Sequence, residues 1–168
     1  MIKPVLKTKN YWDGVLYKFE IYLSSDFSKL SGVSQAYGAV LDEENRLLVV
    51  SQDGKDWGLP GGTVESKEVL VDTLKREVYE ESAVVVDSET IKPFYYQEVY
   101  SRTNGRWELS DIQVRFACRI EKIDKFVSDP DEGKVKYQKF VSVSDLGNFL
   151  KWGETTEFIQ KEIIKFLK

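Results

Sequence analysis

The chain has 168 residues, enough for one domain, and its 42% hydrophobic and 31% charged residues are typical of a folded protein. It contains no histidine and one cysteine, Cys118, which excludes histidine catalysis, histidine-ligated zinc, an internal disulfide and any paired-cysteine site. The net charge of −4 argues against nucleic acid as a partner. No apolar run has the length of a membrane span and no signal-peptide pattern opens the chain, so we expect a cytoplasmic protein without a membrane partner.

The hydrophobic pattern predicts a mixture of strands and helices. Strands are expected at 15–23, 35–41, 46–52, 84–86 and 135–143. Residues 94–100 and 107–120 are expected to pair as a hairpin, because Asn104-Gly105 between them is a favourable turn sequence. The Gly- and Pro-rich stretch 57–62 is predicted to lack regular structure.

Two helices are expected, at 66–82 and at 154–167. The first has an apolar stripe at helical spacing, no Gly or Pro, and Ser66 as its predicted N-cap. The second is an amphipathic segment that closes the chain. The first helix lies within the strongly acidic segment 65–89, which carries eight acids and three bases.

The clearest chemical signature lies in the second half of the first helix. Because each helical residue advances by about 100°, Glu77, Glu80 and Glu81 share one face within a single turn. Their mutual repulsion costs roughly a few tenths of a kcal/mol per pair, which a bound cation would relieve. Clustered carboxylates are the hard oxygen ligands that Mg²⁺ and Mn²⁺ prefer, so this face is a candidate metal site.

A solvated acidic helix face is the plainer interpretation of three neighbouring glutamates. Two features favour the metal site over it. Arg76 adjoins the cluster, and the loop WGLPGG at 57–62 precedes the helix. Paired glycines let a backbone approach a ligand closely, so this loop can bring carbonyl oxygens near the carboxylates.

Residues 62–84 resemble the Nudix box, G-x5-E-x7-R-E-U-x-E-E-x-G-U, where U is a bulky aliphatic residue. The matching residues are Gly62, Glu68, Arg76, Glu77, Val78, Glu80, Glu81 and Val84. The resemblance implies the family's α/β/α sandwich with a mixed sheet, here a hydrolase domain of residues 33–168. Residues 1–32 would form an N-terminal extension that adds a strand to the domain.

The resemblance also implies a role for each matching residue. It assigns the metal ligands to Glu77, Glu80 and Glu81, with a backbone carbonyl from Gly61 or Gly62. Arg76 matches the arginine that orients a glutamate through a salt bridge, and Glu68 matches its structural partner. The implied cofactor is Mg²⁺ or Mn²⁺, and the implied reaction is hydrolysis of a nucleoside diphosphate linked to another moiety.

One residue departs from the box. Ala83 stands where the pattern has glycine, a residue suited to a left-handed helix C-cap. We expect alanine either to adopt that conformation at a cost of roughly 1 kcal/mol or to end the helix differently. The carboxylates precede this position, so their geometry should survive the change.

The general base and the substrate stay open. Without histidine the base is a carboxylate or metal-bound water, and the carboxylate candidates after the box are Glu98, Glu108, Asp111 and Glu132, each of which is otherwise an ordinary surface charge. Aromatic residues that would stack on a nucleotide base are Tyr37, Trp57, Tyr95, Tyr96, Tyr100 and Trp107. Tyr100, 16 residues after Val84, tilts the resemblance toward diadenosine polyphosphate hydrolases.

We therefore expect a metal-dependent pyrophosphohydrolase whose substrate is a nucleoside triphosphate, a dinucleoside polyphosphate, ADP-ribose or a nucleotide sugar. One alternative is a Nudix-like domain that binds a nucleotide without cleaving it, but the intact glutamates count against this alternative. Another is an unrelated domain whose acidic helix docks a basic partner. Residues 1–32 can extend the sheet, pair two subunits or cover the nucleotide, so a homodimer stays open.

Overall fold

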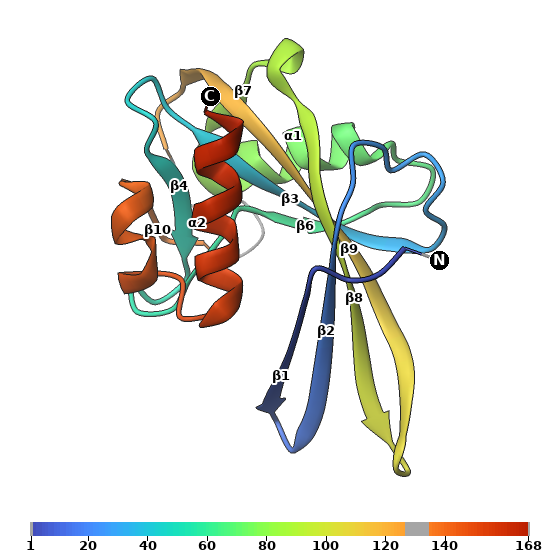
Figure 1. Cartoon of the computed structure of the whole chain (residues 1–168). Helices are drawn as coiled ribbons and strands as arrows, with labels where there is room; N and C mark the ends of the chain where they lie inside the picture. The colour runs from blue at the N-terminus through green and yellow to red at the C-terminus, as the bar shows by residue number, and fades with distance from the viewer. Residues whose placement is uncertain (1, 127–134, 168) are drawn as a thin grey trace.

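The computed structural model describes residues 2–126 and 135–167, and within these ranges ten strands form a sheet flanked by helices (Figure 1). The main path of the sheet is β1 (Leu6–Trp12), β2 (Val15–Leu23), β8 (Lys92–Thr103), β9 (Arg106–Ile123), β3 (Val33–Leu41), β4 (Leu47–Ser51) and β10 (Tyr137–Val141). Three short strands pair beside this path: β5 (Trp57–Gly58) with β4, β6 (Gly61–Thr63) with β3, and β7 (Val84–Val86) with β9. Since β3 and β9 run parallel and the other pairs are antiparallel, the sheet is mixed.

The two long helices cover opposite faces of the sheet. Helix α1 (Leu70–Ser82) buries Leu74 and Val78 in one apolar cluster with Tyr96 and Phe116 of the sheet. Helix α2 (Glu154–Phe166) packs on the other face, in a second cluster with sheet residues such as Ala39 and Tyr95. The predicted α/β/α sandwich is therefore confirmed.

Two hairpins extend away from the helices as long arms of the sheet (Figure 1). The β8–β9 hairpin was expected from Asn104-Gly105, and both residues have the positive φ, 49° and 78°, that a tight two-residue turn requires. Strand β2 has its predicted bounds. Strand β1 was not predicted, because most of its side chains are exposed and carry no hydrophobic alternation. Its local signal was the turn pair Asp13-Gly14, whose φ values are 49° and 80°.

The first helix begins later than expected. The sequence predicted a start at Ser66, but α1 starts at Leu70 and its N-cap is Val69, which provides no side-chain cap. Residues 65–68 instead form a turn closed by the Glu68 amide and the Glu65 carbonyl, with Lys67 at a φ of 68°. Because a left-handed residue interrupts a helix, α1 forms only beyond this turn.

The prediction that 57–62 lacks regular structure was wrong, because the stretch forms strands β5 and β6 on either side of Pro60. The Pro60 carbonyl accepts a hydrogen bond from the Gly38 amide at 2.8 Å, which ties the segment to β3. Gly61 has a φ of 149° and lies so close to β3 that a Cβ there would be 2.4 Å from the Ala36 carbonyl oxygen. Glycine is therefore what allows β6 to pair with β3.

The remaining elements include two short helices that the sequence did not predict, and several strands differ from their expected bounds by one to three residues. A short 3₁₀ helix, η1 (Ser88–Thr90), joins β7 to β8, and η2 (Val143–Asn148) follows β10. The last strand was expected to reach residue 143, but Val143 already belongs to η2. No helix in the described part of the chain is long and apolar enough to cross a membrane. The division between residues 32 and 33 stays a prediction.

Candidate active site

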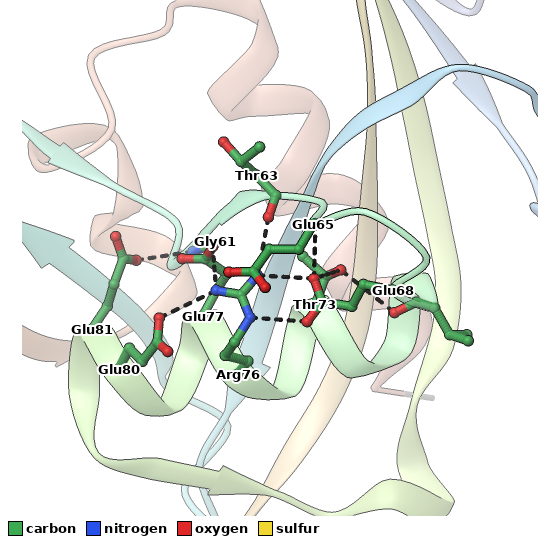
Figure 2. Close-up of polar contacts among 10 residues, drawn as sticks. Gly61, Thr63, Glu65, Glu68, Thr73, Arg76, Glu77, Glu80 and Glu81 are labelled. Atoms are coloured by element: carbon green, nitrogen blue, oxygen red, sulfur yellow. Dashed lines mark hydrogen bonds and ion pairs between the residues drawn. The ribbon is translucent and has the colours of Figure 1, made fainter. Parts of the chain in front are cut away.

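Arg76 is the centre of a polar network on the side of α1 that faces β6 (Figure 2). Its guanidinium donates two hydrogen bonds of 2.9 Å to the Glu68 carboxylate, from Nε to Oε1 and from Nη2 to Oε2. Nη1 donates to Glu77 at 2.8 Å and to Glu80 at 3.2 Å, and Nη2 also reaches the Thr63 carbonyl at 3.0 Å. The planar fork of arginine makes such multiple contacts directional, so it fixes these side chains relative to the loop.

Glu68 fastens the turn before α1 to the helix itself. Besides Arg76, its carboxylate accepts hydrogen bonds from the Thr73 hydroxyl at 2.7 Å and the Glu65 amide at 3.0 Å. These contacts, led by the hydrogen bonds from Arg76, lower the pKa of Glu68 from 4.5 to about 2. The carboxylate is therefore held ionised at neutral pH, which suits the structural role implied by the sequence.

The three glutamates of the predicted face lie along the Gly61–Gly62 segment. Glu77 and Glu80 converge on the same Arg76 nitrogen, and Glu81 accepts a 2.9 Å hydrogen bond from the Gly61 amide. A Cβ on Gly62 would lie 2.5 Å from a carboxylate oxygen of Glu77, so this glycine leaves room for that carboxylate. The observed contact from Gly61 is made by its amide, whereas the sequence predicted a role for a carbonyl.

No group of three or more histidine, cysteine, aspartate or glutamate side chains within residues 2–126 and 135–167 is arranged so that it could hold a metal ion. The donor chemistry nevertheless fits one, since Glu77, Glu80 and Glu81 supply hard oxygen atoms beside Gly61 and Gly62, which have no Cβ. The assignment of these residues as ligands stays a prediction.

Ala83 adopts the conformation that the box reserves for glycine. It is the C-cap of α1, with φ 55° and ψ 21°, and its amide donates to the Tyr79 carbonyl at 2.7 Å. The chain therefore accepts a left-handed alanine in place of glycine. Helix α1 still ends after Ser82, so the glutamates keep their positions within regular helix.

A sequence model described as the NUDIX domain matches residues 34–161. This chain belongs to the NUDIX family. Residues that match the family's box are the ones that the fold gathers between α1 and β6. The fold is accordingly that of a Nudix-type hydrolase.

The similar proteins agree with this placement. The chain is 33% identical over 88 residues to "Nucleoside diphosphate-linked moiety X motif 6" of Mus musculus, a match that covers 50% of this chain and 26% of the mouse protein. It thus spans about a quarter of the length of that relative. Among solved structures, the pyrophosphohydrolase BsRppH of Bacillus subtilis superposes with a TM-score of 0.66 at 20% identity, covering 96% of both chains. An ADP-ribose pyrophosphatase of Streptococcus suis gives a TM-score of 0.55 at 17% identity, covering 80% of this chain and 91% of that one.

Tyr37 of β3 connects the candidate site with the face of the sheet that α2 covers, since Ala39 and Leu41 on the same side of β3 belong to the cluster with α2. Tyr37 lies against Gly61, where a Cβ would be 2.6 Å from its ring, and the Arg115 guanidinium stacks over that ring at 4.8 Å. Burial raises the pKa of Tyr37, Arg115 opposes that rise, and the acids Glu81, Asp111 and Glu77 add to it. Tyr37 thus lies between the glutamates of the box and a buried arginine.

Arg115 is the residue that the sequence analysis missed. Arg115 alternates with the apolar Val114 and Phe116 along β9, a pattern typical of a solvent-facing side chain, yet only 6% of Arg115 is exposed. Arg115, Tyr95, Gln97 and Phe19 of the sheet line a cavity of about 800 Å³, which is also lined by the segment before α2. A second cavity, of about 420 Å³, lies beside Tyr37, Gly61 and Glu81. The sequence signal that could have identified Arg115 was the presence of an arginine on a central strand.

The general-base candidates have different surroundings. Glu98 accepts hydrogen bonds from Tyr100 at 2.5 Å and Tyr22 at 3.3 Å, and Glu108 is exposed near the end of the β8–β9 arm. Asp111 accepts a bond from Ser34 at 2.8 Å and lies on the same face of β9 as Arg115. Glu132 falls outside the described residues.

The aromatic residues proposed to stack on a nucleotide base also have different surroundings. Tyr37 and Tyr95 line the two cavities. Trp57 packs edge-on against Phe149, and Tyr96 stacks on Tyr22. Two others lie under ammonium groups: Lys18 lies 4.0 Å from the Tyr100 ring centre and 5.5 Å from that of Trp107. The tilt toward diadenosine polyphosphate hydrolases that rested on Tyr100 therefore gains no support from its position.

Proposed function

We propose that this Nudix-type hydrolase cleaves a pyrophosphate bond in a nucleoside diphosphate linked to another moiety. The observation that carries the proposal is the network in which Arg76 and the Gly61 amide hold Glu77, Glu80 and Glu81 beside the two glycines of β6. Such a concentration of ionised oxygens costs repulsion in the folded protein, and divalent cations are what relieve it. The similar proteins named for nucleoside diphosphate-linked or pyrophosphate substrates support the same reaction class.

In this proposal the glutamates bind the metal, and Arg76 and Glu68 orient them. Glu77, Glu80 and Glu81 would hold Mg²⁺ or Mn²⁺, which when bound polarises phosphoryl oxygens and offsets the charge of the leaving phosphate. Arg76 orients Glu77 and Glu80, while Glu68 orients Arg76. The cavity lined by Gly61 and Glu81 would give the diphosphate space beside one of these three carboxylates.

Asp111 is the carboxylate that we propose as the base. Of the candidates in the described residues, it is the one whose charge raises the pKa of Tyr37, as the charges of Glu77 and Glu81 do, and this shared influence on one ring supports the choice. We expect Asp111→Asn to lower kcat at least tenfold while Glu108→Gln, on the exposed arm, leaves it unchanged. Equal kcat values for the two variants would remove Asp111 from this role.

The proposed function is tested by hydrolysis of a substrate panel. The purified protein is incubated with nucleoside triphosphates, dinucleoside polyphosphates, ADP-ribose, NADH and nucleotide sugars, first with Mg²⁺ or Mn²⁺ and then with excess EDTA. We expect cleavage products from at least one class with the metal and none with EDTA. Binding without cleavage across the panel would instead support the nucleotide-sensing alternative. A cytoplasmic location and a homodimer stay predictions.

A further inference from the structure

The cavity on the α2 face of the sheet contains a buried cation that the fold itself does not neutralise. Arg115 forms no ion pair with a carboxylate in the described residues. Its Nη atoms donate to Gln113, to the side chain at 2.8 Å and to the carbonyl at 3.3 Å. Its Nε is buried without a hydrogen-bond partner, as is the Tyr95 hydroxyl.

Such an arrangement is costly unless a ligand completes it. A buried charge normally has a charged partner, and a buried donor without an acceptor costs about 1–3 kcal/mol. Here the guanidinium lies near two aromatic rings, with its centre 4.8 Å from that of Tyr37 and 5.4 Å from that of Tyr95. The rings stabilise the charge but accept no hydrogen bond from Nε. An anionic ligand would supply the missing acceptor.

The position of Arg115 fits a phosphate in particular. Tyr37 separates it from Gly61 and Glu81, so a group bound to Arg115 is one side chain away from the proposed reaction centre. Arginine is the side chain whose fork matches the oxygen atoms of phosphate. The lysines of β1 and β2 that border the cavity place their ammonium groups elsewhere: Lys7 and Lys18 pair with Glu20, and Lys9 lies over Trp107. Lys151, also in the lining, is exposed and lies 3.8 Å from Asp56, and the lining carboxylate of Glu154 is exposed. Arg115 is therefore the buried cation of this cavity.

The walls of the cavity fit a flat aromatic group. Phe19 lines it on the β2 side, and Trp152, which precedes α2, lines it on the other side. Trp152 also lies near β5, since a Cβ on Gly58 would be 3.9 Å from its ring. Thr8, Asn10 and Thr155 add hydrogen-bonding groups. A volume of about 800 Å³ is ample for a nucleotide.

From these contacts we propose that the cavity binds a nucleoside monophosphate unit of the substrate, with the phosphate on Arg115 and the base against Phe19 and Trp152. The proposal rests on the proposed function for the identity of the substrate as a nucleotide. Arg115 thereby becomes a specificity-determining residue that selects a phosphorylated nucleoside over an uncharged one.

Binding without metal isolates this subsite from the box. In excess EDTA, isothermal titration calorimetry is carried out with AMP, GMP, CMP and UMP, and with the corresponding nucleosides and ribose 5-phosphate. We expect at least one monophosphate to bind more tightly than both its nucleoside and ribose 5-phosphate. Arg115→Met should weaken that monophosphate at least tenfold and leave its nucleoside unchanged, because the guanidinium that would bind the phosphate is removed while Phe19 and Trp152 stay in place. Arg106→Met, at the exposed start of β9, is the matched control and should bind like the wild type.

Two further variants separate this role from a structural one. Arg115→Met should keep or raise the Tm, since it replaces an unneutralised buried charge by a shorter, apolar and unbranched side chain, which outweighs the loss of the hydrogen bonds to Gln113. Trp152→Ala, at the cavity rim, should weaken the nucleoside and the monophosphate alike. The subsite is wrong if no monophosphate binds, or if Arg115→Met binds it as the wild type does or loses the nucleoside equally. Arg115-dependent binding without any hydrolysis would overturn the proposed function and leave the subsite standing.

Discussion

Gly61 and Gly62 are adjacent, but a side chain added at each would meet different neighbours. At Gly61 an added Cβ would meet backbone atoms of β3, at 2.4 Å and 2.5 Å, and the φ of 149° strains any other residue. At Gly62 it would meet the carboxylate of Glu77, which is the far end of a flexible side chain. One glycine therefore serves the fold and the other serves the position of Glu77.

This difference predicts opposite outcomes for two alanine variants. Gly61→Ala should lower the free energy of unfolding by about 2–4 kcal/mol, because strain and overpacking add. Gly62→Ala should change it by less than about 1 kcal/mol but lower kcat by roughly 10–100-fold, because Glu77 is displaced. Urea unfolding and steady-state kinetics on both proteins measure this. If Gly62→Ala kept the wild-type kcat, Glu77 would not need its present position.

The left-handed conformation of Ala83 at the end of α1 lowers the stability of the fold relative to a glycine at this position. Ala83→Gly should raise the free energy of unfolding by about 0.5–1 kcal/mol, since glycine adopts a positive φ without the alanine penalty. Ala39→Gly in β3 is the control, and it should destabilise by about 1 kcal/mol or more because no such strain exists there. Thermal unfolding of the two variants compares them. A lower Tm for Ala83→Gly would mean that the alanine methyl group contributes more than its conformation costs.

At the level of secondary structure, the ion pair between Glu68 and Arg76 joins α1 to the turn before it and makes stability depend on pH. The folded pKa of Glu68, about 2, is below its ordinary 4.5. Its contribution is therefore complete above pH 4.5 and is lost as the pH falls toward 2.

Replacing this carboxylate should flatten the acid side of the stability profile. At pH 7, Glu68→Gln should be less stable than the wild type by about 1–3 kcal/mol, because Arg76 loses the carboxylate with which it forms two hydrogen bonds and keeps only Glu77 and Glu80 as charged partners. The difference should shrink as the pH is lowered from 4.5 toward 2, where the wild-type carboxyl is protonated as well. Urea unfolding across this range measures it, with exposed Glu65→Gln as control. A difference that stayed constant with pH would show that the ion pair is not its cause.

What the sequence predicted well was set by local chemistry. The apolar stripe of α1 and the Asn104-Gly105 turn depend on residues close in the chain, so these elements were found. The turn at Lys67 was not found, because the contacts of Glu68 with Thr73 and Arg76 fix it from outside the turn. The Nudix box named the residues of the network but not its hydrogen bonds, and the ligand roles of the glutamates stay untested.

Longer-range features were beyond such rules. Arg115 occupies a strand position that alternation assigns to solvent, and it is buried because β1, β2 and the segment before α2 enclose that face. Strand β1 pairs only along one edge and shows little hydrophobic pattern of its own. The cavity depends on how distant segments meet, which no local pattern in the sequence contains.

Across the whole molecule, two apolar clusters lie on opposite faces of one sheet. Because they share the sheet, we expect them to unfold together. Leu74 of α1 and Ile159 of α2 are both fully buried, on opposite faces. Leu74→Ala and Ile159→Ala should each cost about 2–5 kcal/mol, and each should shift one common unfolding transition. Circular dichroism and tryptophan fluorescence during urea unfolding should give the same midpoint for each variant. Separate midpoints would mean that the two layers unfold independently.

The central claim is that Glu81 acts through its charge in a metal-dependent hydrolysis. Glu81→Gln preserves an oxygen that can accept the Gly61 hydrogen bond and removes the negative charge, so the fold should be retained. With Mg²⁺ and the best substrate of the panel, we expect kcat to fall at least about 100-fold and Mg²⁺ binding to weaken, while exposed Glu43→Gln matches the wild type. A folded Glu81→Gln protein with wild-type kcat would contradict the account.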